Sequence, residues 1–139
     1  MVSLESRARL KWLAVVLAGL AAGAYVLIAN RILAVGDLAP SEAPAAIIYM
    51  AAGCYLLGGL LILLRWRWLW ILGASVNALV VLIFVQSYLA RPAVMFSPGG
   101  LVSKALQVLL ELSLLSLIVV DWRRLKMPDP SRPAGRSLS

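Results

Sequence analysis

Two side chains that commonly carry out chemistry in proteins are missing or nearly missing from this sequence. It has no histidine and a single cysteine, Cys54, which lies within an apolar run. Histidine is the commonest haem and transition-metal ligand and the usual proton carrier at neutral pH. Its absence argues against a b-type cytochrome, a zinc peptidase or a Ser-His-Asp hydrolase, so we expect no cofactor and no metal. One cysteine can form no disulfide within the chain and says nothing about the redox compartment.

Charge is also scarce. Only 14% of the 139 residues are charged and 63% are hydrophobic, whereas about a quarter of the residues in a soluble domain are charged. A chain of this size cannot hide so much apolar surface in its own core, so the composition predicts a membrane protein. The net charge of +7 comes from basic residues that flank apolar runs. This placement favours orientation in a membrane, and we expect no nucleic-acid partner.

Four apolar runs of about 20 residues each match the thickness of a hydrocarbon core. They lie at residues 12–31, 45–64, 68–89 and 101–120. The predicted fold is all-α, an antiparallel four-helix bundle integral to the membrane, formed by residues 1–122. Between the second and third runs the connection RWR is so short that we expect a tight antiparallel hairpin. Residues 123–139, rich in Pro, Ser and Arg, form a predicted disordered cytoplasmic tail.

The basic residues predict which side each end of the chain occupies. Ten of them lie at the two ends or between the second and third runs, against three elsewhere: Arg31, Arg91 and Lys104. This excess favours both termini in the cytoplasm. The ten are Arg7, Arg9, Lys11, Arg65, Arg67, Arg123, Arg124, Lys126, Arg132 and Arg136.

Aromatic residues favour the same orientation. The five tryptophans fall at the same predicted interface, which indole prefers, and they are Trp12, Trp66, Trp68, Trp70 and Trp122. After the fourth run, Arg123, Arg124 and Lys126 are expected to contact anionic lipid. The preference for Arg over Lys, with much Ala and Leu, is typical of a bacterial chain and favours the bacterial cytoplasmic membrane.

The first run permits a second interpretation. A basic start followed by an apolar stretch containing AGLAAGA resembles a signal peptide that would be cleaved. The run is long for the apolar region of a signal peptide. We therefore count it as the first membrane span and leave cleavage as an alternative.

Three polar residues lie within the fourth apolar run. Lys104, Gln107 and Glu111 are spaced i, i+3 and i+7, so they share one stripe of a helix. Glu111 lies at the middle of its run, where a charge costs about 2.5–3.5 kcal/mol on insertion scales. The aliphatic residues of the run offset this cost, so the helix still inserts. Glu111 should then face protein or a wet cavity.

Other polar residues are expected at or near this depth on the remaining helices. The candidate intramembrane polar site comprises Glu111, Asn77, Gln107, Tyr55, Lys104, Gln86 and Tyr25. Two main interpretations stay open, beside a lipid-facing or intersubunit role for Glu111. The residues form a pocket that opens outward with Glu111 and Asn77 near its floor, or Asn77 and Glu111 form a polar clamp between helices.

Two functions fit these features. The first is an accessory or scaffold subunit of a membrane complex, with a protein partner or a homo-oligomer. The alternative is a small proton-coupled transporter or ligand-binding membrane protein that uses the buried glutamate. Multidrug exporters of the small type share that device, although here the glutamate is on the last helix. The layout is also similar to that of DoxX-like proteins, with their tight inner hairpin. An enzyme is not favoured, because one buried acid is no catalytic constellation.

Overall fold

The computed structural model describes residues 4–39, 41–64 and 66–125 of the chain. All secondary structure in these ranges is helical, which confirms the all-α prediction. The helices are α1 (Leu4–Ala29), α2 (Ala45–Leu63), α3 (Arg67–Tyr88), α4 (Pro92–Met95) and α5 (Pro98–Leu125). By length and composition, α1, α2, α3 and α5 can each cross a membrane.

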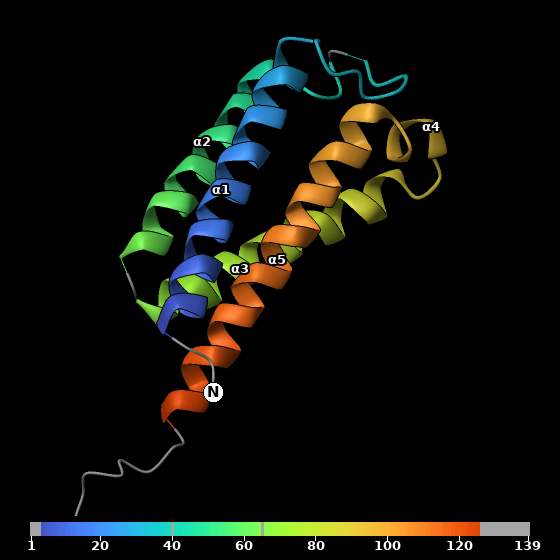
Figure 1. Ribbon diagram of the computed structural model, residues 1–139. Helices are drawn as coiled ribbons and strands as arrows, with labels where there is room; N and C mark the ends of the chain where they lie inside the picture. Colours follow the sequence, from blue (N-terminus) through green and yellow to red (C-terminus); the bar gives the residue numbers. More distant parts are fainter. Residues whose placement is uncertain (1–3, 40, 65, 126–139) are drawn as a thin grey trace, which may run out of the picture.

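The four long helices alternate in direction along the chain (Figure 1). The start of α1 and the finish of α5 lie at one end of the molecule, here called the terminal end. The loops formed by residues 30–39 with 41–44 and by residues 89–97 lie at the opposite end, the loop end. Proline helps to set the local boundaries there, because Pro44 precedes the first residue of α2 and Pro92 begins α4.

Helix α5 is longer than the predicted fourth run. It begins at Pro98 and continues to Leu125, so Arg123 and Arg124 belong to the helix and not to the predicted tail. The rest of that tail, including Lys126, Arg132 and Arg136, lies outside the described residues, as does Arg65.

Helix α1 lies between α2 and α5 and packs against both, whereas α3 packs mainly on α5. Alanines on the buried side of α1 allow this close packing. Ala14, Ala18 and Ala22 are almost fully buried, and Ala18 lies directly opposite Gly59 of α2. The four long helices are therefore arranged in the order α2, α1, α5, α3.

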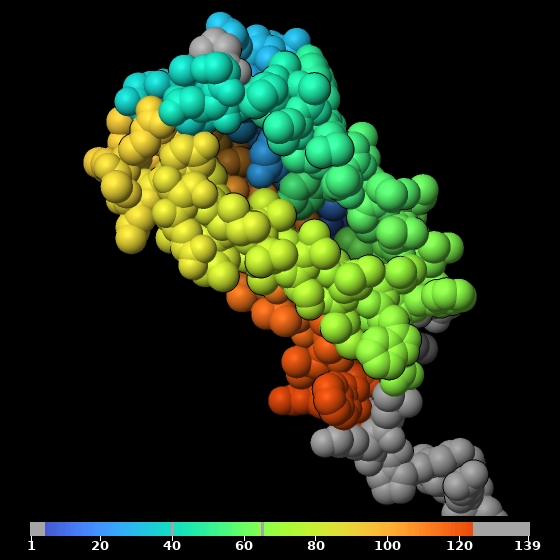
Figure 2. All heavy atoms as spheres, turned by 180° about the vertical axis from the view of Figure 1, so that it is seen from behind, coloured from blue at the N-terminus to red at the C-terminus, as the bar shows by residue number. Residues whose placement is uncertain are grey.

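The predicted tight hairpin between the second and third runs is wrong. Helices α2 and α3 are joined by only three residues, yet α2 packs far more extensively on α1 than on α3. The buried residues of α3, namely Trp70, Ala74 and Asn77, form a face that packs on α5. Towards the loop end, α2 and α3 separate, and Figure 2 shows a hollow between them in which atoms of α1 and α5 are visible.

Trp70, one of the five tryptophans predicted at the membrane interface, is buried within the protein. Only 1% of its surface is exposed, and its ring nitrogen donates a hydrogen bond to the carbonyl of Ile62 at 3.2 Å. The Arg7 guanidinium lies over the ring, 5.6 Å from its centroid. The other four tryptophans are exposed, as expected. Trp70 is therefore a core residue, and its hydrogen bond joins the start of α3 to the end of α2.

An acidic residue that the sequence analysis did not single out holds the terminal end together. Asp121 of α5 pairs with Arg7 of α1 at 2.6 Å and with Arg67 of α3 at 3.7 Å. One carboxylate thus joins three helices. Two of the basic residues interpreted as signals of orientation also stabilise the fold.

Candidate functional site

Asn77 is the centre of a polar network at mid-length in the bundle. Its side-chain nitrogen donates to Oε2 of Glu111 and to the backbone carbonyl of Gln107, both at 2.9 Å. Its side-chain oxygen accepts a hydrogen bond from the Tyr55 hydroxyl at 2.9 Å. Only 4% of Asn77 is exposed. An amide can donate and accept at the same time, and here it links α2, α3 and α5.

Gln107 extends the network to α1 and towards the loop end. Its side chain is fully buried, and its nitrogen donates to the hydroxyls of Tyr25, at 2.8 Å, and of Tyr55. Its oxygen accepts a hydrogen bond from Lys104 Nζ at 2.6 Å. The rings of Tyr25 and Tyr55 stack, with centroids 5.5 Å apart. Each of the four long helices therefore supplies at least one member of the network.

Four hydrogen bonds of this network form one continuous series from donor to acceptor. Lys104 donates to Gln107, Gln107 to Tyr55, Tyr55 to Asn77, and Asn77 to Glu111. A basic residue stands at the donor end and a carboxyl group at the acceptor end. Hydrogen bonds aligned head to tail polarise one another. This series joins the amino group of Lys104 to the carboxyl group of Glu111, about 10 Å away along the helix axis. This relay explains how one apolar helix carries both Lys104 and Glu111.

Six of the seven predicted site residues belong to this network. Gln86 is exposed on α3 and takes no part in the hydrogen bonding that the described residues show. The sequence analysis missed Phe84, whose ring lies under Lys104 with Nζ 4.1 Å from its centroid. Such a cation–π contact stabilises an ammonium group away from water. An aromatic residue in an apolar helix carries no sequence signal that marks this role.

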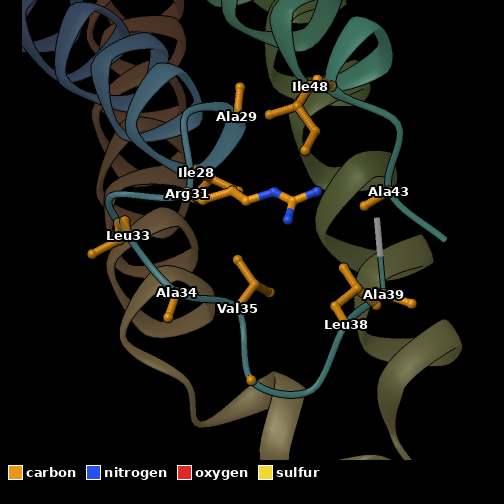
Figure 3. Close-up of a pocket in the computed structure, with 12 residues that line it drawn as sticks. Ile28, Ala29, Arg31, Leu33, Ala34, Val35, Leu38, Ala39, Ala43 and Ile48 are labelled. Atoms are coloured by element: carbon orange, nitrogen blue, oxygen red, sulfur yellow. The ribbon is translucent and has the colours of Figure 1, made fainter. Parts of the chain in front are cut away.

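A cavity at the loop end lies apart from the predicted polar site. It has a volume of about 240 Å³ and lies at the loop end, between the last turn of α1, residues 33–39 and the start of α2 (Figure 3). None of the seven predicted site residues lines it. In the described part of the chain, every buried side-chain nitrogen or oxygen has a hydrogen-bond partner. At mid-length, the hydrogen bonds of Asn77 join α2, α3 and α5.

The loop end contains a second polar group, centred on Arg91. Its guanidinium pairs with Glu42 at 2.8 Å and with Asp37 at 3.3 Å, and so ties the two loops together. The Ala39 N–H and then the Arg91 guanidinium hold the pKa of Glu42 below its usual range. Glu42 and then Asp37 raise the pKa of Arg91 above its usual value.

The geometry defines an all-helical protein with four helices of membrane-spanning length and an internal polar relay between them. Among the residues that the structure describes, no three side chains of the metal-binding types gather into a group. Comparison with protein-family models, with curated proteins and with solved structures finds no match for this chain.

Proposed function

We propose that the chain is a multi-pass integral membrane protein, with both ends in the cytoplasm of a bacterial cell. Large apolar side chains at mid-length are more than half exposed on all four long helices, as at Leu20, Leu56, Leu82 and Leu112. Water would penalise this surface by about 25 cal/mol per Å², and lipid would not. The basic residues and exposed tryptophans at the terminal end support the orientation.

The same orientation places the last turn of α5 against the cytoplasmic leaflet. Arg123 is exposed there, and we propose that Arg123 and Arg124, both in α5, contact anionic lipid. Each basic residue near an anionic surface contributes about 1 kcal/mol of attraction. Lys126, the third member of the predicted set, lies beyond the part of the chain described.

Within the membrane, we propose that the protein serves as an accessory or scaffold subunit. The observation that carries this proposal is the polar relay, because its members bond to one another and lock four helices together. Glu111 receives its bond from Asn77, which is what a clamp between helices requires. The hollow between α2 and α3 supports the proposal further, because it offers a helix of a partner protein a place to pack.

One observation favours a second candidate, a proton-coupled or ligand-binding protein. Glu111 is only half-buried, and among the described residues only its Oε2 atom receives a hydrogen bond. Its Oε1 atom therefore has room to accept a proton or to contact a solute. Buried acids at mid-membrane depth often have such roles.

Glu111→Gln separates the two candidates. The amide keeps an oxygen that can accept the bond from Asn77, but it cannot exchange a proton at neutral pH. A scaffold variant should purify in mild detergent with the same partner, in the same ratio, as the original chain. The measurement is the composition of the purified complex, with Ser116→Ala, which removes an exposed hydroxyl bonded within its own helix, as the matched control.

The alternative predicts a different result in liposomes. If the original chain discharges a pH gradient and Glu111→Gln does not, the protein is a proton-coupled transporter. That result, together with a chain that purifies without any stoichiometric partner, would overturn the scaffold proposal.

A further inference from the structure

We propose that the cavity at the loop end binds the anionic headgroup of a membrane amphiphile, a phosphate or a carboxylate that carries an acyl chain, with Arg31 as its anchor. This inference rests on the membrane placement proposed above. It concerns a site at the opposite end of α1 from the chain terminus and involves no member of the polar relay.

The cavity combines one positive charge with apolar walls. Arg31 follows the last turn of α1, and its guanidinium projects across the space towards α2, with Ile48 on one side and Val35 on the other (Figure 3). Ile28, Leu33 and Leu38 add to the apolar lining. An arginine fork can bind two oxygens of a phosphate or a carboxylate, and the apolar walls suit the methylenes that follow.

The charge of Arg31 is not neutralised by its surroundings. Its side chain makes no ion pair and no hydrogen bond with any residue in the described ranges. The two acids of the loop end, Asp37 and Glu42, both pair with Arg91. The loop end thus holds two guanidinium groups, and its described acids serve only one of them. An anion from outside the chain would pair with the second guanidinium group, that of Arg31.

The backbone at Arg31 supplies an independent observation. Its φ is 58°, in the left-handed region that favours glycine, and it is the one non-glycine residue with positive φ in the described part of the chain. The position closes α1, since the Ile32 N–H reaches back to the Leu27 carbonyl at 2.9 Å. Glycine would serve this cap without strain. The strained arginine is explained if its guanidinium has a function in the cavity that it faces.

The size and position of the cavity favour an amphiphile over a free anion. Its volume of about 240 Å³ lies just below the range of about 300–1,000 Å³ for pockets that enclose a drug-sized ligand. It therefore suits a headgroup and the start of a chain. Because it lies where α1 ends and α2 begins, it would open at the boundary between headgroups and hydrocarbon.

The test is a titration of the purified full chain in detergent with short-chain phosphatidylglycerol, phosphatidylcholine or inorganic phosphate. Thermal unfolding, followed by tryptophan fluorescence, reports binding as a rise in Tm. We expect phosphatidylglycerol to raise Tm and the other two probes to leave it unchanged at the same concentration. An equal rise with phosphatidylcholine, or with inorganic phosphate, would overturn the proposal.

Arg31→Gly gives the sharpest variant, because binding and stability should change in opposite directions. Glycine relieves the backbone strain, so Tm without lipid should stay the same or rise, while the affinity for phosphatidylglycerol should fall by about tenfold or more. Arg9→Gln, which removes an exposed charge at the other end, should keep the full response. An undiminished response in Arg31→Gly would refute the assignment. A chain absent from the membrane fraction of cells would instead refute the membrane placement.

Discussion

At the scale of single residues, Asn77 joins three partners through one buried side chain. It bonds to Tyr55, Gln107 and Glu111, and these partners come from α2 and α5. The basic group of Lys104 and the carboxyl group of Glu111 sit on one apolar helix because Gln107, Tyr55 and Asn77 bridge them. The cost of placing polar groups in hydrocarbon is offset by bonds among those groups.

Asn77→Ala should destabilise the protein, because it removes three hydrogen bonds and leaves Tyr55 and Glu111 short of a partner. Interhelical hydrogen bonds in membrane proteins contribute about 0.6 kcal/mol each on average, so we expect a loss of about 1–3 kcal/mol. Denaturant unfolding in detergent measures it. Ser116→Ala is the control and should stay within about 0.5 kcal/mol of the original chain. Equal stability of the two variants would contradict the central role of Asn77.

At the scale of elements, the first loop of the loop end is held to the start of α5 by a backbone hydrogen bond and to the second loop by side-chain ion pairs. The Gly99 N–H donates to the Ala34 carbonyl at 2.8 Å, and Arg91 adds its ion pairs to Asp37 and Glu42. Gly36, with φ 56°, lies so close to α4 that a Cβ atom there would be 2.3 Å from the Ala93 carbonyl oxygen. Position 36 needs glycine for two reasons: the positive φ, and the lack of space for a side chain.

Gly36→Ala should therefore separate the first loop from α4 and cost about 1–3 kcal/mol. Gly53→Ala in the middle of α2 is the matched control. A Cβ atom at Gly53 would meet nothing within 4 Å, and alanine there should be neutral or stabilise the helix by up to about 1 kcal/mol. Thermal unfolding of both variants measures the difference. The packing of the two loops described here would be wrong if Gly36→Ala were as stable as Gly53→Ala.

At the scale of the whole molecule, the four long helices are held together at the terminal end. Towards the loop end, one side of the bundle is open. Asp121 and Trp70 draw α1, α2, α3 and α5 together at the closed end. Beyond the relay, α2 and α3 separate and leave the hollow seen in Figure 2. In the proposed scaffold role, a helix of a partner protein would occupy this hollow.

The proposed orientation predicts the labelling of single cysteines in intact cells. In a Cys54→Ala background, Ser41→Cys in the first loop should react with a maleimide that cannot cross the membrane. Glu5→Cys near the start of α1 should react only after the cells are permeabilised. Both positions are exposed in the folded chain. The reverse pattern would invert the orientation, and reaction at both positions in intact cells would contradict a membrane between them.

The four long helices were predictable because each depends on a continuous run of apolar residues, which is a local property. The polar site was partly predictable for a similar reason. Lys104, Gln107 and Glu111 share a stripe of one helix, and Asn77 and Tyr55 fall at comparable depth. Gln86 was misplaced because depth along a helix does not tell which way a side chain points around it.

The sequence by itself determined where apolar length, basic flanks and intramembrane polar residues occur, since each follows from the solvent that a segment of given composition prefers. Only the tertiary structure decided that α2 separates from α3, that Trp70 is buried and that Asp121 joins three helices. It also decided that Arg31 faces a cavity, while the described acids of the loop end pair with Arg91. These features depend on which face each helix turns towards its neighbours and on which helices those neighbours are. Those choices are set by side-chain fit between segments far apart in the chain.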